Sequence, residues 1–335
     1  MNKRVGTQTV KTEGVYIKAT AAIGGTKEKD GPIGDSFDVL MPDAEWGEET
    51  WEKTESKMQK EVLKIAARKA GLETADLNYI FAGDLLNQCI GAGFGFRDMN
   101  VPYYGIYGAC STMIEGIGLG AMLIGGNCAE NLGAVTSSHF CTAERQYRMP
   151  LEYGGQRTPT AQWTVTGSGC TILSSSGAGP KVTHVTTGKI MDMGVKDANN
   201  MGAAMAPAAL STIKAHFEDL GKTASDYDLI VTGDLGQLGK DVLLTMAQKE
   251  GVPLGGKLTD CGTLVFDQMT QDVHSGGSGC GCSAITLCGY LLEKLNTGKL
   301  DSILFCGTGA LLSPTSVQQG LPISGVCHAV SIMRG

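Results

Sequence analysis

The chain has 335 residues, of which 42% are hydrophobic and 18% charged, and its formal net charge at pH 7 is −7. A chain of this size buries a substantial core, and an acidic balance without a basic run excludes a surface that follows nucleic-acid phosphates. We expect no secretory leader, because no apolar stretch of about seven residues follows the charged start. We expect no membrane span, because no apolar run reaches the ~20 residues that a bilayer crossing needs. The 11 cysteines are interpreted as reduced, mostly buried residues.

In chain order, the first charged, glycine-containing segment, residues 24–35, is predicted to be a loop. Residues 51–70 carry apolar side chains at helical spacing and predict an amphipathic helix. A short apolar strand follows at residues 79–82. In the second half, the helix that corresponds to residues 51–70 is expected at about residues 203–220. Residues 139–163 are predicted to be an extended loop. The strands lack a clean alternation, which indicates a sheet covered on both faces in an α/β fold.

The chain repeats itself in two places. The segment GLETADLNYIFAGDL, from Gly71, aligns without gaps on GKTASDYDLIVTGDL, from Gly221. A second pair follows in the same order, CSTMIEGIGLGAML from Cys110 and CSAITLCGYLLEKL from Cys282. Two matches in one order indicate a duplication. We therefore predict two halves, residues 1–176 and 177–335, joined near the glycine-rich SSSGAGPK segment.

Cys110 is the first candidate for chemistry. It follows a buried segment and precedes a helix, where unpaired backbone N–H groups and the helix dipole favour negative charge. This position predicts a stabilised thiolate that suits a nucleophile for acyl transfer. The alternative is a small residue packed at the corner between a strand and a helix.

The duplicated α/β unit with GACST at the start of a helix resembles the thiolase and ketosynthase superfamily, whose nucleophilic cysteine occupies that place. Longer motifs, spread over essentially the whole chain, resemble the stage V sporulation protein AD family of spore-forming Firmicutes. These motifs are GDLLNQ from Gly83, YGACST from Tyr107, SSHFCTAERQYRMPLEYGGQRTPTAQWTVTG from Ser137, KDANNMGAAMAPAA from Lys196, HSGGSGCGCSA from His274 and GTGALLSPTS from Gly307.

The resemblance implies a thiolase-like α/β fold: a duplicated five-layer α-β-α-β-α arrangement with pseudo-twofold symmetry, which in thiolases forms a homodimer. It also implies binding of dipicolinic acid, pyridine-2,6-dicarboxylate, alone or with calcium, for uptake into the developing spore. The partners it implies are the other stage V A membrane proteins, which form a channel. The protein would then be peripheral at the forespore inner membrane and otherwise cytoplasmic. No cofactor and no metal site in the protein are predicted.

The catalytic set of the superfamily is predicted to be incomplete. Condensing enzymes use a histidine, or a histidine and an asparagine, from the second half to activate the cysteine and hold the oxyanion. By the internal repeat, Asp234 or its neighbours stand in the histidine loop, and GSGCGCSA contains neither residue. His274 and His328 remain as possible substitutes. We therefore predict a non-enzymatic binding protein, with acyl transfer by Cys110 as the alternative.

The ligand-binding residues are predicted from the quoted motifs: Asp84, Asn87, Cys110, Ser111, Ser137, His139, Arg145, Asp234 and Thr308. Arg145, together with Arg148, is a candidate cation for a carboxylate, or else pairs with Glu144 or Glu152. His139 either bonds the Cys110 region or fills the core. Asp84 and Asp234 hold adjacent turns or face the pocket, where calcium or a proton would offset their charge.

Overall fold

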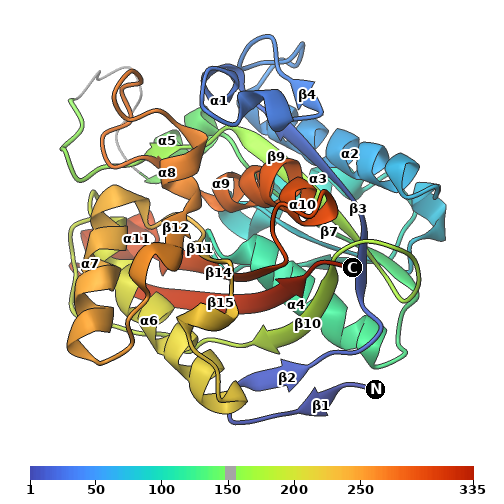
Figure 1. Ribbon diagram of the computed structural model, residues 1–335. Helices are drawn as coiled ribbons and strands as arrows, with labels where there is room; N and C mark the ends of the chain where they lie inside the picture. Colours follow the sequence, from blue (N-terminus) through green and yellow to red (C-terminus); the bar gives the residue numbers. More distant parts are fainter. Residues whose placement is uncertain (148–155) are drawn as a thin grey trace.

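Most of the strands are linked in one mixed sheet that runs through the middle of the molecule (Figure 1). The computed structural model describes residues 1–147 and 156–335. Their main strands are β3 (Tyr16–Gly24), β5 (Tyr79–Gly83), β6 (Tyr103–Gly105), β7 (Asn131–Ser138), β9 (Gly167–Ser174), β10 (Lys181–Thr186), β11 (Leu229–Thr232), β12 (Leu258–Asp260), β14 (Ser302–Leu311) and β15 (Ser324–Met333). The shorter strands are β1 (Lys3–Arg4), β2 (Thr9–Lys11), β4 (Val39–Leu40), β8 (Trp163–Thr164) and β13 (Gly277–Ser278), of which β8 and β13 pair only with each other.

The strand order shows the duplication directly. It runs β12-β11-β14-β15-β10-β3-β9-β7-β5-β6, and β10 meets β3 through a single residue pair, Lys181 with Tyr16. On each side of that pair the pattern is the same. β7 and β14 pair antiparallel with β9 and β15, and parallel with β5 and β11. Two equivalent five-stranded sheets thus meet at a pseudo-twofold axis.

Helices cover and separate these two sheets. They are α1 (Thr26–Lys29), α2 (Trp51–Lys69), α3 (Ile90–Phe96), α4 (Thr112–Gly125), α5 (Phe140–Tyr147), α6 (Met201–Leu220), α7 (Gly236–Lys249), α8 (Cys261–Val265), α9 (Cys280–Ile285), α10 (Leu292–Asn296) and α11 (Pro314–Gln318). Helix α2 packs on β3, β7 and β9, and α6 packs on β14 and β15. Helix α4 contacts strands of both sheets, so it lies in the central layer. This is the predicted five-layer α/β arrangement.

Side-chain hydrogen bonds mark the start of both outer helices, α2 and α6, and a glycine marks the end of α6. The hydroxyl of Thr50 accepts a hydrogen bond from the Lys53 N–H at the start of α2, and the Asn200 side chain accepts one from Ala203 at the start of α6. Helix α6 ends at Gly221, whose φ of 62° is the left-handed conformation that glycine adopts at low cost. Both helices match the predicted ranges within two residues.

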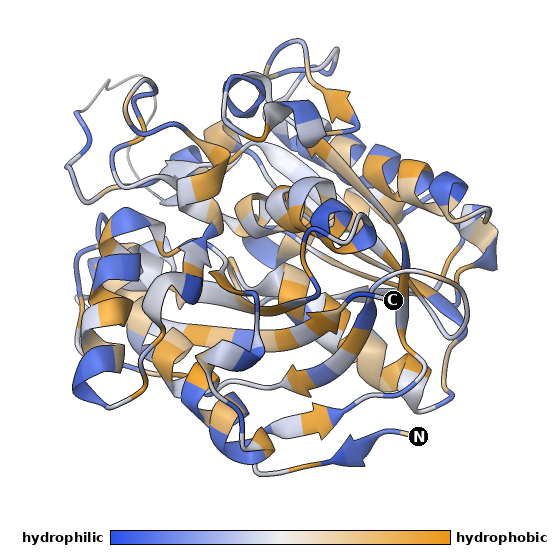
Figure 2. Cartoon of the chain, in the orientation of Figure 1, coloured by the Kyte–Doolittle hydropathy of each residue, from blue (hydrophilic) through white to orange (hydrophobic). Residues whose placement is uncertain are grey.

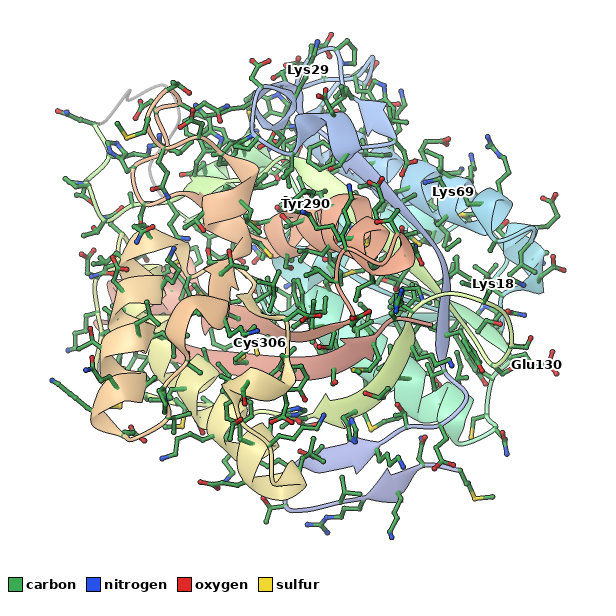
Figure 3. The ribbon with its side chains drawn as sticks, viewed as in Figure 1. Lys18, Lys29, Lys69, Glu130, Tyr290 and Cys306 are labelled. Carbon is green, nitrogen blue, oxygen red and sulfur yellow. The ribbon has the colours of Figure 1, made fainter. Side chains whose placement is uncertain are left out.

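The core divides by layer. One cluster of buried apolar side chains fills the centre around α4, a second lies under α6, and a third lies under α2. Hydrophobic residues follow the central strands, while hydrophilic ones face outward on the covering helices (Figure 2). Lys29, Lys69 and Glu130 are exposed, whereas Cys306 is buried between layers (Figure 3). Nine of the 11 cysteines are buried, and all 11 are free thiols.

Two loop predictions are wrong in part, although residues 156–162 do lack helix and strand as predicted, and residues 148–155 lie outside the described residues. Residues 24–35 contain helix α1 and the start of a 3-10 turn at Gly34–Ser36. The predicted loop at 139–163 begins with helix α5. Thr142, Ala143 and Glu144 are buried, and this burial stabilises a helix that the composition of the segment did not indicate. Among the described residues, no helix is both long and apolar enough to cross a bilayer.

Candidate functional site

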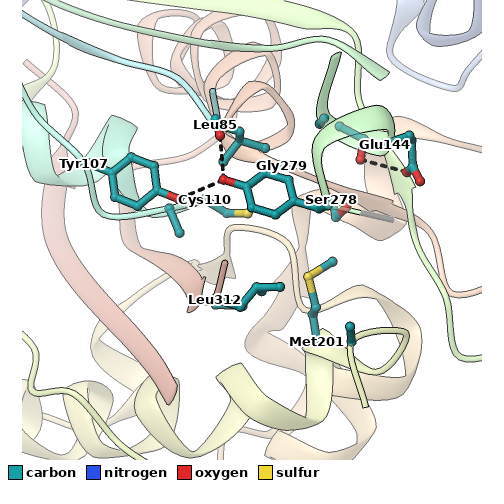
Figure 4. A pocket seen from close by; sticks show the side chains of 14 residues that line it. Leu85, Tyr107, Cys110, Glu144, Met201, Ser278, Gly279 and Leu312 are labelled. Carbon is teal, nitrogen blue, oxygen red and sulfur yellow. Dashed lines mark hydrogen bonds between the residues drawn. The ribbon is translucent and has the colours of Figure 1, made fainter. Parts of the chain in front are cut away.

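A small pocket opens beside Cys110, between the two halves of the chain (Figure 4). Its void measures about 50 Å³. The lining residues come from both halves: Leu85, Tyr107, Ala109, Cys110, Ala143, Glu144, Tyr147, Thr164, Ala198, Met201, Ser278, Gly279, Ala310 and Leu312. In Figure 4, Tyr107, Cys110 and Gly279 lie on one side, with Met201 and Leu312 facing them. The walls are mainly apolar, as is usual for a small-molecule site.

A tight turn presents Cys110 to this pocket. Ala109 has a φ of 51°, a left-handed conformation that is uncommon for a residue with a side chain. The Ser111 N–H and hydroxyl both donate to the Gly108 carbonyl, and the Thr112 hydroxyl donates to the Ala109 carbonyl. Helix α4 begins at Thr112, two residues after the cysteine. The turn therefore holds the thiol just ahead of the helix.

The second half supplies a carboxyl group near the thiol. The Asp234 carboxyl, just beyond the end of β11, is held near the Cys110 thiol and raises its pKa. Its Oδ1 accepts from the Thr308 hydroxyl at 2.8 Å, and its Oδ2 accepts from the Gly279 N–H at 2.9 Å. The Asp234 N–H in turn donates to the Thr308 hydroxyl at 3.1 Å. Cys110, Asp234 and Thr308 are thus brought together from distant parts of the sequence.

The electrostatics of this arrangement overturn the prediction of a stabilised thiolate. Burial raises the pKa of the Cys110 thiol well above its usual value, and the neighbouring Asp234 carboxyl raises it further. The Gly279 N–H acts in the opposite direction but is outweighed. Burial also raises the pKa of Asp234 to about 6. At neutral pH the thiol is therefore protonated.

A glycine turn closes the far side of the site. Gly279 has a φ of 98°, and a Cβ there would lie 2.7 Å from the Ser138 hydroxyl, so only glycine fits. The next residue, Cys280, donates from its thiol to the Ser137 carbonyl at 2.8 Å. Cys110 and Cys280 share a small buried cluster with Leu85. Cysteines from the two halves therefore lie in one cluster, although the repeat aligns Cys110 with Cys282 rather than with Cys280.

Two tyrosines form another wall. The Tyr147 hydroxyl donates to the Leu85 carbonyl at 2.6 Å, and the Tyr107 and Tyr147 hydroxyls lie 3.1 Å apart. Because Tyr147 has one hydrogen to donate, Tyr107 donates to Tyr147. Opposite them the Thr164 hydroxyl donates to buried Glu144 at 3.1 Å. The pocket therefore offers aromatic faces with a few hydroxyl groups.

Three other predicted polar residues lie away from the pocket lining and hold the surrounding structure. Asp84 accepts backbone hydrogen bonds from Leu86 and Ala92, at 2.9 and 2.7 Å, so it fixes the turn into α3. The Ser137 hydroxyl bonds the buried Glu55 carboxyl at 3.0 Å. Asn87 is exposed, and its N–H donates to Gln146. Ser111, described above, is buried behind Cys110.

His139 and Arg145 also point elsewhere. The His139 Nε2 lies 2.8 Å from the Ala44 carbonyl, and its Nδ1 accepts from Cys141. Arg145 pairs with Glu52 and lies over the Trp51 ring, half exposed. Neither residue contacts Cys110, and the acid that Arg145 meets is neither of the two expected. Arg148 and Glu152 lie outside the described residues.

No histidine takes part in the pocket lining within residues 1–147 and 156–335. The two substitutes suggested by the sequence are engaged elsewhere. His274 lies 3.5 Å from the Asp272 carboxylate, and the His328 Nδ1 accepts from the Gly188 N–H. The described residues therefore place no histidine beside the thiol.

Several lining residues were not predicted, although the motifs contain them. Tyr107 begins YGACST, Ser278 and Gly279 stand in HSGGSGCGCSA, and Leu312 stands in GTGALLSPTS. The quoted motifs therefore marked the right segments, but within them polar and charged residues were selected rather than apolar residues and glycines. Tyr147 and Glu144 were missed because their segment was interpreted as a loop.

The chain is similar to known proteins in both sequence and fold. The family model described as Stage V sporulation protein AD matches residues 6–333. Stage V sporulation protein AD of Bacillus subtilis (strain 168) is 41% identical over 320 residues, which cover 96% of this chain and 94% of that protein. Among solved structures, 3-oxoacyl-[acyl-carrier-protein] synthase III from Aquifex aeolicus VF5 superposes with a TM-score of 0.59 at 16% identity, covering 96% of this chain and 100% of that one.

A variant of OleA from Xanthomonas campestris superposes similarly, with a TM-score of 0.61 at 13% identity, covering 96% of this chain and 99% of that one. At such identities the solved structures show the fold alone. They confirm the thiolase-like fold that the sequence predicted.

Proposed function

The chain belongs to the Stage V sporulation protein AD family, and from that premise we propose that it binds dipicolinic acid in the pocket beside Cys110, without catalysis, for uptake into the developing spore. The Bacillus subtilis relative is named as a sporulation protein rather than as an enzyme. The observation that carries the proposal is the burial of the Cys110 thiol, which together with the nearby Asp234 carboxyl raises its pKa where a condensing enzyme needs a base to activate it. A protonated, buried thiol is a poor nucleophile.

The pocket walls suit a flat aromatic acid. Tyr107, Tyr147, Leu85 and Met201 offer apolar surface to a ring. The two tyrosine hydroxyls already share a hydrogen bond and can turn to meet a carboxylate oxygen. Because Glu144 lines the pocket and Asp234 stands behind Cys110, a dianion needs calcium or a proton to offset repulsion. We propose the calcium complex as the preferred form.

Calorimetry with dipicolinate, with and without calcium, tests this proposal. We expect saturable binding to the wild type, tighter with calcium, and weaker binding by Cys110→Ala. Ala198→Trp places a ring at the half-buried rim of the pocket and should abolish binding. Ala178→Trp, in the exposed turn between β9 and β10, is the matched control and should bind normally. No binding by a folded wild type under any condition would overturn the proposal and leave a structural scaffold.

The alternative function is acyl transfer, favoured by the position of Cys110 ahead of a central helix in a thiolase-like fold. Incubation with a short-chain acyl thioester, followed by mass spectrometry of the Cys110 peptide, separates the two functions. The binding proposal expects no acyl adduct. A stoichiometric adduct that disappears in Cys110→Ala would establish the enzyme instead.

We also propose that the protein acts with the other stage V A membrane proteins at the forespore inner membrane. Membership of the sporulation family supports this partnership. A fluorescent fusion in sporulating cells should gather at the forespore membrane and disperse when those membrane proteins are deleted. An unchanged pattern after their deletion would contradict the partnership.

A further inference from the structure

Three oxygen-bearing side chains gather at one end of the pocket. Glu144, on α5, is buried and lines the pocket, and its Oε1 accepts from the Thr164 hydroxyl at 3.1 Å. Ser278, also in the lining, is paired directly with Thr164 between β13 and β8, so the two side chains point to the same face. In Figure 4, Glu144 and Ser278 lie towards one end and Tyr107 lies at the other. We call Glu144, Thr164 and Ser278 the oxygen end.

The rest of the pocket offers an anion no positive charge. Among the described residues that line it there is no lysine, arginine or histidine. The remaining hydroxyls belong to Tyr107 and Tyr147, which bond one another, and Tyr147 also donates to the Leu85 carbonyl. A free dianion would therefore share an apolar pocket with the Glu144 carboxylate, and bringing two buried negative charges together is costly. A divalent cation between them removes that cost.

We infer that the oxygen end binds the cation of a chelated ligand, so that the pocket selects the calcium complex over free dipicolinate. The inference rests on the proposed function, since dipicolinate is the chelator. Its ring nitrogen and two carboxylates hold one cation together and leave further coordination positions open. Calcium takes roughly six to eight oxygen ligands in a flexible geometry, so a carboxylate and hydroxyls of the protein can complete its shell. Thr164, by donating to Glu144, also orients that carboxylate.

The protein does not hold such a cation by itself. Within residues 1–147 and 156–335, no group of three or more histidine, cysteine, aspartate or glutamate side chains could hold a metal ion. The nearby Asp234 carboxyl accepts from the Thr308 hydroxyl and the Gly279 N–H and stands behind the lining. The oxygen end thus has a single carboxylate and needs the chelator to supply the other ligands. Calcium alone should therefore not bind.

Glu28 provides the matched control. Glu28 and Glu144 are both buried, and both accept from one short stretch of chain. The Thr164 hydroxyl donates to Glu144, and the Thr166 N–H donates to Glu28 at 2.9 Å. Glu28 is not among the residues that line the pocket. Glu28→Gln and Glu144→Gln each replace one buried carboxyl by an amide beside this stretch, so the difference between them reports the position of Glu144 in the pocket.

The experiment is calorimetry at neutral pH with dipicolinate in excess calcium, with dipicolinate free of divalent cations, and with calcium alone. The readout is the ratio of the affinities for the calcium complex and for free dipicolinate. Glu144→Gln should weaken binding of the calcium complex about tenfold and leave free dipicolinate bound at least as well, because a repelling charge is gone. Glu28→Gln should keep the wild-type ratio. Thr164→Val, which removes only the donor to Glu144, should lower the ratio by less and is the second variant if Glu144→Gln misfolds.

The affinity ratio separates cation binding from a structural role. A folded Glu144→Gln protein that keeps the wild-type ratio, or loses affinity for both forms equally, would overturn the inference. Binding of calcium alone by the wild type would overturn it as well, because it would reveal a resident cation site. In these cases the proposed function stands as long as the wild type binds dipicolinate in either form. A wild type that binds neither form would end both.

Discussion

At the scale of single residues, this molecule is marked by buried carboxyl groups whose desolvation outweighs every stabilising neighbour. Burial raises the pKa of Asp260 and of Glu28 to about 7, and that of Glu55 to about 8. Each of these carboxyls accepts hydrogen bonds from backbone or hydroxyl groups, which offset only part of the desolvation cost. The folded state therefore binds protons that the unfolded state has released.

This predicts a stability that falls as pH rises. For Asp260 the unfolded pKa is 3.8 and the folded value about 7, so the free energy of unfolding decreases from about pH 4 to pH 7. The loss for this group is on the order of a few kcal/mol. Urea titrations at pH 5 and pH 8 should show the wild type more stable at pH 5. Asp260→Asn should narrow that difference.

Exposed Asp241→Asn, which leaves every buried carboxyl in place, serves as the control and should keep the wild-type difference. Because the histidines His184 and His216, whose pKa values burial lowers, act in the opposite direction, the decisive result is the comparison of variants: an Asp260→Asn protein that keeps the full wild-type difference would contradict the assignment of this carboxyl.

The buried aspartates also show what could not be predicted from the sequence alone. Asp84 and Asp234 occupy one position of the repeat, and the sequence left both roles open for each. Their roles differ because Asp260, 26 residues after Asp234 and in no visible motif, accepts the N–H groups of the turn. A contact of that kind depends on strand pairing between β11 and β12, which no local pattern encodes.

At the scale of elements, the repeat predicted what both halves share. The strands after Gly71 and Gly221 and the helices before them appear as expected. The second copy of the central helix departs from the first, since a π-helical stretch at Thr286–Leu291 interrupts it between α9 and α10. Helix α5 was missed because its stability comes from burial rather than from its own composition.

The packing of β14 against the turn before α4 yields a prediction at this scale. A Cβ on Gly309 would lie 2.3 Å from the Gly108 carbonyl and 3.2 Å from the Ser111 N–H. Gly309→Ala should therefore push the Cys110 turn out of place and destabilise the protein by about 1–3 kcal/mol. Thermal unfolding measures the loss of stability, and dipicolinate calorimetry measures the effect of the displaced turn on binding.

Gly256→Ala is the control, because a Cβ there meets nothing within 4 Å and its φ is not positive. It should leave both the melting temperature and the binding unchanged. A Gly309→Ala protein of wild-type stability and affinity would show that the turn has room to move.

At the scale of the whole molecule, the pseudo-twofold symmetry fails at the two ends of the sheet. β12 ends one side partly buried beside α8, whereas all three residues of β6 are exposed at the other. Tyr103 and Tyr104 stand on β6, and Ile90 and Phe94 are exposed on the adjacent helix α3. An exposed edge strand beside apolar side chains is a site where another strand can add.

We propose that this edge pairs with β6 of a second copy, forming the homodimer expected from the thiolase-like resemblance. A twofold axis lets two identical edge strands pair antiparallel, so that Tyr104 of each copy packs against the other copy. Light scattering of the wild type should give twice the mass of one chain. Tyr104→Lys, at a side chain 53% exposed, should shift the protein towards monomer, whereas Met269→Lys, at one 92% exposed, should not. A wild type that stays monomeric at high concentration would show that β6 is left open for a different strand.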